Sequence, residues 1–147
     1  RLRFYRALRY GTCVCSIRRD SQRRANIWFS TLFGGGTNYA HGEDTLFLCD
    51  AFRRGLRVYT SSFCLGTCAK DASTCFHGFD EKYFHDQGVL YRAAFGAAAA
   101  PLCLRFCLKR YSAYRGEMTF FRALRAMYRG TRETPSDKRP QRGTGAQ

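Results

Sequence analysis

The spacing of apolar residues predicts a helix that runs directly into a strand near the middle of the chain. From residue 43 onward, apolar residues recur every three or four positions: Phe47, Leu48, Ala51 and Phe52. This spacing builds one apolar helix face. The helix opens with acidic residues, closes with arginines and meets Gly55, an order that suits the helix macrodipole and a glycine stop. Residues 56–62 then alternate between apolar and polar side chains, as a half-buried strand does. The succession of helix and strand indicates an α/β fold.

Other segments predict one more strand and several helices. Residues 12–17 form a strand-like run, and Asp20 or Ser21 can cap a short helix that follows. The second half predicts three helices, over residues 81–96, 97–111 and 117–130. The last of these has one apolar face, made by Phe120, Leu124, Met127 and Tyr128. Residues 131–147 contain proline, glycine and charge without a hydrophobic anchor, so we expect a disordered tail.

A strong excess of positive charge changes the expected partners. The chain carries 25 lysines and arginines against 11 acidic residues, a formal net charge of +14. Such a balance favours nucleic acid, anionic lipid or phosphorylated ligands. The hydrophobic content of 45% supports a packed core. The longest apolar stretch, residues 93–104, is short and contains Pro101, so we expect no transmembrane helix. Residues 1–10 are rich in arginine and no apolar core follows them, so we expect no signal peptide.

Eight cysteines add no clear metal site. They are Cys13, Cys15, Cys49, Cys64, Cys68, Cys75, Cys103 and Cys107. Those on the predicted helices are expected to act as small buried hydrophobes. The cluster C-x3-C-x6-C-x-H that ends at His77 carries metal-binding groups, but its spacing matches no common zinc pattern. A disulfide framework is not expected, because the chain is apolar enough to fold without one.

A glycine-rich loop, "GGGTNYAHG", directly precedes the adjacent carboxylates Glu43 and Asp44. Acidic residues in a first helical turn are commonly explained by capping and by the helix dipole. The same placement fixes a carboxylate on a rigid element, next to a loop that a substrate can approach closely. Both interpretations fit the pair taken by itself.

Four short segments occur in a fixed order around these carboxylates: "SIRRDS", "FSTLFGGG", "GEDTLF" and "GLRVYTS". In this order and spacing they resemble the C-terminal half of the catalytic domain of bacterial family-2 glycosyltransferases. The later segment "STCFHGFDEKYFHDQGVLYRAAFG" is similar to the region after the acidic motif in members that build capsule and cell wall. The resemblance covers about residues 12–130.

The resemblance implies a partial GT-A fold, an α/β fold that binds a nucleotide sugar, with a helical C-terminal extension. It implies that Asp44 is the general base that takes the proton from an acceptor hydroxyl, with Glu43 beside it to contact the acceptor or orient Asp44. Candidate contacts to the donor or acceptor sugar are Gly36, Asn38, Tyr39, His41 and Gly42; a solvated loop is the alternative. Enzymes of this kind hold a divalent metal, Mn²⁺ or Mg²⁺, through an upstream D-x-D motif.

The sequence contains no D-x-D motif and lacks the nucleotide-binding βαβ half. We therefore expect a fragment that is inactive by itself. Residues 1–80 would form the acceptor-side part of the catalytic domain, residues 81–130 the C-terminal helices and residues 131–147 the tail. The C-terminal helices either bind an anionic membrane surface or pack on the missing half.

The expected function is the transfer of a sugar from a nucleotide-sugar donor to a hydroxyl of a carbohydrate or lipid-linked acceptor, in cell-surface polysaccharide synthesis. The expected location is cytoplasmic and peripheral, at the inner face of the plasma membrane. The alternative is a basic protein that binds nucleic acid or the ribosome, which the charge and the mixture of arginines with aromatic residues favour. The arginines are spread along the chain and form no recognised RNA-binding module, so we expect no nucleic-acid partner.

Overall fold

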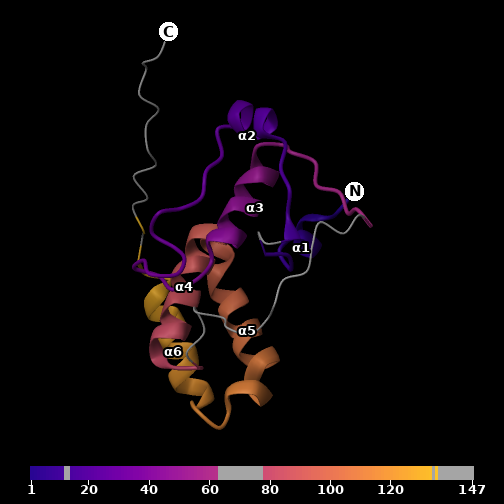
Figure 1. The fold of residues 1–147 in the computed structure, drawn as a ribbon. Coiled ribbons are helices and arrows are strands. Elements are labelled where there is room, and N and C mark those ends of the chain that lie inside the picture. Colours follow the sequence, from indigo (N-terminus) through magenta and orange to yellow (C-terminus); the bar gives the residue numbers. More distant parts are fainter. Residues whose placement is uncertain (12–13, 63–77, 134, 136–147) are drawn as a thin grey trace.

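The computed structural model describes residues 1–11, 14–62, 78–133 and 135. Its elements, in chain order, are α1 (Phe4–Ala7), α2 (Arg19–Ala25), α3 (Glu43–Arg53), α4 (Glu81–Phe95), the 3-10 turn η2 (Gly96–Ala98), α5 (Ala99–Tyr114) and α6 (Phe120–Gly130). Helices α4, α5 and α6 lie side by side, and α3 lies between this bundle and α2 (Figure 1). The cysteine and histidine cluster that ends at His77 falls outside the described residues, as does most of the predicted tail.

The prediction of an α/β, partial GT-A fold is wrong. Among the described residues all regular structure is helical, and the only β pairing is an isolated bridge between Phe33 and Tyr39. Residues 56–62 were expected to form a strand, but they are neither helical nor paired with a strand among the described residues. Their backbone meets the N-terminal segment through a hydrogen bond from Leu2 N–H to Val58 O at 2.7 Å. Alternation shows how side chains divide between two faces, whereas a sheet also needs a neighbouring strand to complete the ladder.

The core of the helical bundle is shared by α4, α5 and α6. Its buried members are Phe84, Cys103, Cys107, Tyr114, Met118, Ala123, Ala126 and Met127. Phe84 and Tyr114 are fully buried, and their rings meet edge to face with centroids 4.8 Å apart. The Tyr114 hydroxyl donates to the carbonyl oxygen of Cys107 at 3.0 Å, so the polar end of this buried ring is satisfied.

Two glycines allow α4 and α6 to pack backbone against backbone. A Cβ added to Gly88 would lie 2.1 Å from the Met127 carbonyl oxygen. A Cβ added to Gly130 would lie 2.1 Å from the His85 carbonyl oxygen. Neither contact leaves room for a side chain. The residues that α6 buries are accordingly small or flexible: Ala123, Ala126, Met127 and Gly130.

The predicted apolar face of α6 is therefore only partly confirmed. Met127 is buried, but Phe120, Leu124 and Tyr128 are only partly buried against the core. The buried face is rotated toward the alanines, because the close approach of α4 selects the smallest side chains. The large apolar residues border this contact, and Phe121 is 80% exposed.

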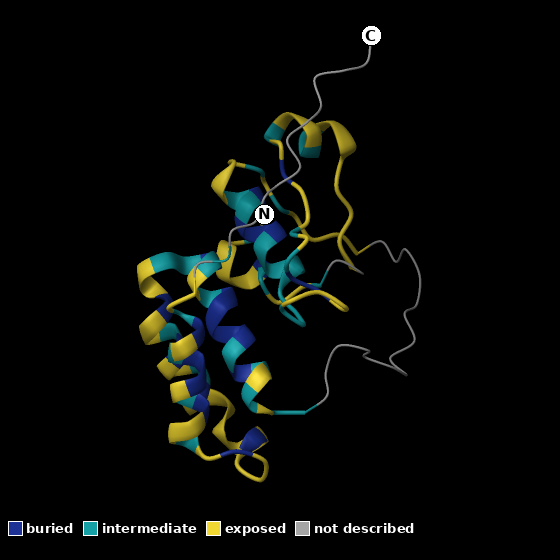
Figure 2. Cartoon of the chain, turned by 90° about the vertical axis from the view of Figure 1, so that its left-hand side faces the viewer, coloured by how far each residue is buried: buried dark blue, intermediate teal, exposed yellow. Residues whose placement is uncertain are grey.

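Helix α3 joins the first half of the chain to the bundle. Phe47 and Ala51 pack with Ile27 in one core cluster, and the Phe47 ring stacks on Phe29 with centroids 4.2 Å apart. A second cluster, in which Phe33 packs with Val89 and Leu90 of α4, fastens the loop before α3 to the bundle. Figure 2 shows the buried positions along the facing sides of these helices. The sequence predicted α3 correctly, including its acidic start.

The described helices also confirm the prediction that their cysteines are core residues. Cys49, Cys103 and Cys107 are fully buried, and none of them forms a disulfide. Burial raises the pKa of the Cys103 thiol to about 12 and that of Cys49 to about 11. These thiols therefore remain protonated near neutral pH.

One helical stretch, Glu81–Tyr114, is long and apolar enough to cross a membrane by length and composition. This is weak evidence for membrane association, and it differs from the expectation that no such stretch exists. The stretch is not one straight rod. At its middle Gly96 has a positive φ of 58°, and α4 and α5 on either side pack against each other through Phe84 and Phe106.

The close approach of α4 and α6 predicts that Gly88→Ala destabilises the protein. In a helix interior this change would ordinarily stabilise by roughly 1 kcal/mol through helix propensity. Here the added methyl group collides with backbone, so we expect a loss of about 3 kcal/mol in the free energy of unfolding. Gly116→Ala is the matched control, because nothing lies within 4 Å of its Cβ. Urea denaturation measures both, and a Gly88→Ala protein as stable as the parent would contradict the packing.

Burial also predicts which thiols react. At pH 8 we expect iodoacetamide to modify exposed Cys15 at least about a hundredfold faster than Cys103, because thiolate is the reactive form and burial both depletes and shields it. Peptide mass spectrometry of timed samples gives the two rates. Denaturant should remove the difference, whereas equal rates in the native protein would show that the bundle core is open.

Candidate functional site

The start of α3 is fixed by a glycine that no other residue can replace without strain. Gly42 precedes the helix with φ +116°, in the region that favours glycine. A Cβ at this position would also lie 2.6 Å from a methyl carbon of Leu90 on α4. The first turn of α3 is thereby held against the bundle. Glu43 and Asp44, which follow directly, begin on a rigid support.

The glycine loop folds over Glu43. Gly34 has φ +124°, and a Cβ added there would lie 3.3 Å from the carboxyl carbon of Glu43. The Glu43 carboxylate therefore lies against bare backbone, at a place where a side chain on the loop would crowd it. The glycines at residues 34 and 42 are thus required by position, which their composition alone did not show.

Asp44 has an oxygen without a hydrogen-bond partner. Its Oδ1 atom is buried and accepts no hydrogen bond from the described residues. The residue before α3 is Gly42, so no side chain caps this helix. Helix α4 offers a comparison within the same chain, because the Asp80 carboxylate before it accepts from Tyr83 N–H at 2.6 Å. Asp80 is a capping residue, whereas Asp44 lies within the first turn of α3 and does not cap it, although its negative charge suits the helix dipole.

The loop that precedes the carboxylates closes on itself. Gly34 N–H donates to Tyr39 O at 2.9 Å, and Tyr39 N–H donates to Leu32 O at 3.0 Å. The Thr37 hydroxyl lies 2.9 Å from the carbonyl oxygens of Leu32 and Gly34. Gly36 lies at the exposed turn of this loop with φ +79° and with open space around it. A glycine-rich segment thus forms a tight turn beside Glu43.

Two of the predicted sugar-binding side chains have partners within the protein. The Tyr39 hydroxyl donates to Glu133 Oε2 at 3.0 Å, and its pKa is raised, first by burial and then by that carboxylate. His41 Nε2 lies 3.0 Å from Gln87 Oε1, and its ring stacks on Tyr83. Both side chains fasten the loop to α4 or to the end of α6. A role in substrate binding remains a prediction for them.

Asn38 and Gly36 stay accessible on the same loop. Asn38 is exposed, and its carbonyl oxygen accepts from the Lys82 ammonium at 3.1 Å. Of the five predicted sugar contacts, these two lie on the solvent side, Tyr39 and His41 face the bundle, and Gly42 supports α3. The structure thus brings Gly34, Gly42 and the two carboxylates together.

A buried carboxylate that the sequence did not single out anchors the loop. Asp86 is 1% exposed, and its Oδ2 accepts from Ala40 N–H at 3.0 Å and from Lys82 Nζ at 2.6 Å. His85 Nδ1 lies 3.4 Å from the other carboxylate oxygen, and His85 Nε2 lies 3.0 Å from Glu133. The sequence does indicate an ion pair between Lys82 and Asp86, because the two residues are four apart on a predicted helix. This spacing does not reveal that the Asp86 carboxylate is buried.

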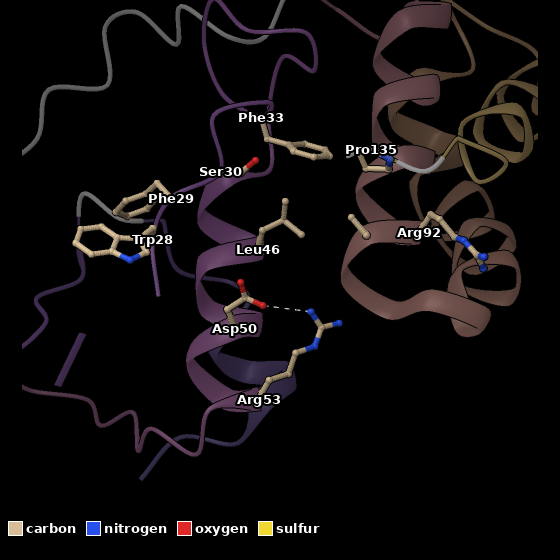
Figure 3. Close-up of a pocket in the computed structure, with 10 residues that line it drawn as sticks. Trp28, Phe29, Ser30, Phe33, Leu46, Asp50, Arg53, Arg92 and Pro135 are labelled. Carbon is tan, nitrogen blue, oxygen red and sulfur yellow. Dashed lines mark hydrogen bonds and ion pairs between the residues drawn. The ribbon is translucent and has the colours of Figure 1, made fainter. Parts of the chain in front are cut away.

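A cavity of about 230 Å³ lies beside α3. Trp28, Phe29 and Phe33 contribute aromatic walls. Figure 3 shows the paired Asp50 and Arg53 side chains on α3, with Arg92 of α4 across the opening. Neither Glu43 nor Asp44 lines this cavity, so it is separate from the carboxylate pair.

The described residues contain no group of three or more side chains that could hold a metal ion. Glu43 and Asp44 supply two carboxylates without a third ligand. The divalent metal that the resemblance implies would be held by an upstream D-x-D motif, which this sequence lacks, so that expectation does not involve the Glu43–Asp44 pair. The chemistry open to the pair is proton transfer. Comparisons of the chain with protein-family models, with curated proteins and with solved structures find no significant match.

The role of Asp86 predicts a specific effect of Asp86→Ala. Ala40 N–H would lose its acceptor in a part-buried site, so we expect a loss of about 2 kcal/mol in the free energy of unfolding. Amide hydrogen exchange at Ala40 should accelerate by about tenfold or more. Asp20→Ala removes an exposed carboxylate from the first turn of α2 and should change stability by only about 0.5 kcal/mol. Unchanged exchange at Ala40 would rule out Asp86 as the anchor.

Proposed function

We propose that this chain supplies the acceptor-activating part of a glycosyltransferase, with Asp44 as the general base. The donor is a nucleotide sugar, and the acceptor is a hydroxyl of a carbohydrate or lipid-linked saccharide in cell-surface polysaccharide synthesis. The ordered motifs that resemble family-2 glycosyltransferases support this function. The observation that carries it is the buried Asp44 Oδ1 atom, which has no hydrogen-bond partner among the described residues and lies in the first turn of the helix that Gly42 fixes.

The chemistry follows from the weakness of a sugar hydroxyl as a nucleophile. A carboxylate within hydrogen-bond reach accepts the hydroxyl proton as the oxygen attacks the anomeric carbon, which typically contributes about 10²- to 10⁴-fold in rate. The new bond joins the acceptor oxygen to the anomeric carbon. The bond to the nucleotide diphosphate breaks and the diphosphate leaves with the electron pair. The proton stays on the Asp44 carboxylate until solvent removes it.

The local geometry supports this role in two ways. The Asp44 Oδ1 atom has no donor among the described residues, so it retains its capacity to accept a proton or a hydrogen bond. The rigid start of α3, held by Gly42 against Leu90, fixes where that oxygen lies. Glu43 lies next to the glycine turn, and its proposed role is to contact the acceptor or to orient Asp44.

The donor side of the reaction is proposed to come from a segment outside these 147 residues. No D-x-D motif occurs in the sequence, so a metal that offsets charge on the leaving diphosphate would be held elsewhere. The 147-residue chain alone is therefore expected to be inactive. We place the protein at the inner face of the plasma membrane, where lipid-linked acceptors are presented.

The proposal predicts that Asp44→Asn abolishes transfer. In the polypeptide that carries both this chain and a donor site, we expect kcat to fall by at least about 10²-fold, because the amide cannot accept the proton. Donor binding should change less than about twofold. Radiolabelled transfer from a panel of nucleotide sugars measures kcat, and equilibrium dialysis with the nucleotide measures donor binding.

The matched control is Asp20→Asn, which removes a carboxylate from the first turn of α2. If Asp44 acted only through the helix dipole, the two substitutions would have equally small effects. An Asp44→Asn enzyme with kcat within about twofold of the parent would overturn the assignment of the base. Clear transfer by the 147-residue chain alone would overturn the division into two parts.

A further inference from the structure

The exposed side of α5 carries large apolar residues at helical spacing. Leu104 is 39% exposed, Leu108 61% and Tyr111 45%. Steps of four and three residues put these side chains on one side of the helix. The neighbouring side of α5, about a quarter turn away, buries Cys103, Cys107 and Tyr114 in the bundle core. The helix is therefore apolar toward the core and again along a strip that faces solvent.

Helix α6 extends this strip. The Tyr111 ring meets Phe120 with centroids 6.2 Å apart, and Phe120 meets Phe121 at 5.5 Å. Phe121 is 80% exposed, the highest value among the exposed large hydrophobic residues of the described chain. We call this surface the α5–α6 strip; it consists of Leu104, Leu108, Tyr111 and Phe121, bridged by Phe120. Figure 2 shows the outward sides of the bundle helices largely as exposed.

Positive charge surrounds the strip. Residues 96–132 include eight basic residues and one acidic residue, Glu117. The basic residues are Arg105, Lys109, Arg110, Arg115, Arg122, Arg125, Arg129 and Arg132. The Glu117 carboxylate already has a hydrogen-bond partner, because it accepts from Phe79 N–H at 2.7 Å. Residues 96–132 therefore carry a positive charge excess of their own, in addition to the arginines in the rest of the chain.

Several of these cations have no acidic partner among the described residues. Arg122 and Arg129 pair with Glu81 on α4. No ion pair involves Arg105, Lys109 or Arg115 within the described part of the chain, and all three are exposed. Exposed apolar side chains with adjacent cations match the two contributions of interfacial binding, which are apolar insertion and attraction to anionic headgroups.

We propose that the α5–α6 strip is a docking surface for an anionic lipid bilayer. Leu104, Leu108 and Phe121 enter the boundary between headgroups and acyl chains. The adjacent arginines and lysine contact the anionic headgroups. Helices α4, α5 and α6 remain packed, so the protein lies on the bilayer and does not span it. This surface specifies how the proposed transferase would reach a lipid-linked acceptor, although its test measures no transfer.

Charge complementarity favours a bilayer over a second copy of the chain. Two copies that met through this strip would bring the same cations together, and the strip has no acidic side chain of its own to offset them. The planar membrane interface accepts a strip of this kind from one side.

Vesicle co-sedimentation of the 147-residue chain tests the proposal. The vesicles contain phosphatidylcholine alone or phosphatidylcholine with about 30% phosphatidylglycerol, a proportion at which the surface is strongly negative. We expect binding to the anionic vesicles to exceed binding to the zwitterionic ones by about tenfold or more. High salt should weaken but not abolish it, because the apolar contribution remains.

Two variants separate the apolar and the charged contributions. Leu104→Ser with Leu108→Ser should reduce the partition coefficient by about tenfold or more at any salt concentration. Arg105→Gln, Lys109→Gln and Arg115→Gln together should remove most of the preference for anionic lipid. The matched controls lie elsewhere: Val14→Ser with Tyr59→Ser for exposed apolar area, and Arg23→Gln, Arg24→Gln and Arg57→Gln for charge. Unchanged helicity and melting temperature establish that each variant is folded.

Several results would overturn the proposal. They are a folded double-serine variant that binds like the parent, control variants that lose binding equally, or no preference for anionic lipid. Analytical ultracentrifugation that shows a dimer abolished by the double-serine change would assign the strip to a second copy. Competition by generic RNA at physiological salt, lost in the Arg105, Lys109 and Arg115 variant, would assign it to nucleic acid.

Discussion

The backbone contact between α4 and α6 is the constraint on which the rest of the structure depends. Gly88 and Gly130 let the two helices approach so closely that neither glycine position has room for a Cβ atom. Because that contact leaves no room for side chains, α6 buries alanines and turns its larger apolar residues outward. The same geometry that makes the bundle tight therefore creates the exposed aromatic group around Phe121.

The bundle in turn positions the carboxylate pair. Val89 and Leu90, next along α4 from Gly88, form the surface on which Phe33 and Gly42 rest. Asp86, one turn earlier, holds Ala40 N–H. The loop and the first turn of α3 are thus fastened to one helix over about two turns. A change that shifts α4 would move Asp44 without touching it, which links stability of the bundle to geometry of the candidate site.

The sequence predicted elements whose pattern is complete within one segment. Helices α3, α4 and α5 follow their apolar spacing, since a helix satisfies its backbone by itself. The prediction of strands was wrong because a strand needs a neighbouring strand to pair with, and local alternation does not reveal one. The face of α6 and the burial of Asp86 depend on contacts across the fold, so they were not readable from spacing. The sequence indicates that Gly34 and Gly42 belong to a flexible loop, whereas in the structure they allow close contact with Glu43 and Leu90.

The lack of a sheet among the described residues corrects the fold but bears little on the choice between capping and catalysis. That choice depends on atoms within one turn of α3. Asp80 shows what capping looks like in this chain, with a short hydrogen bond from Tyr83 N–H to its carboxylate. The Asp44 Oδ1 atom accepts no such bond from the described residues, although burying an unpaired carboxylate oxygen costs free energy. A protein that needed only the helix dipole could obtain it from an exposed, solvated side chain. The unpaired oxygen therefore favours a donor from outside the described residues, which is what the proposed acceptor hydroxyl would supply.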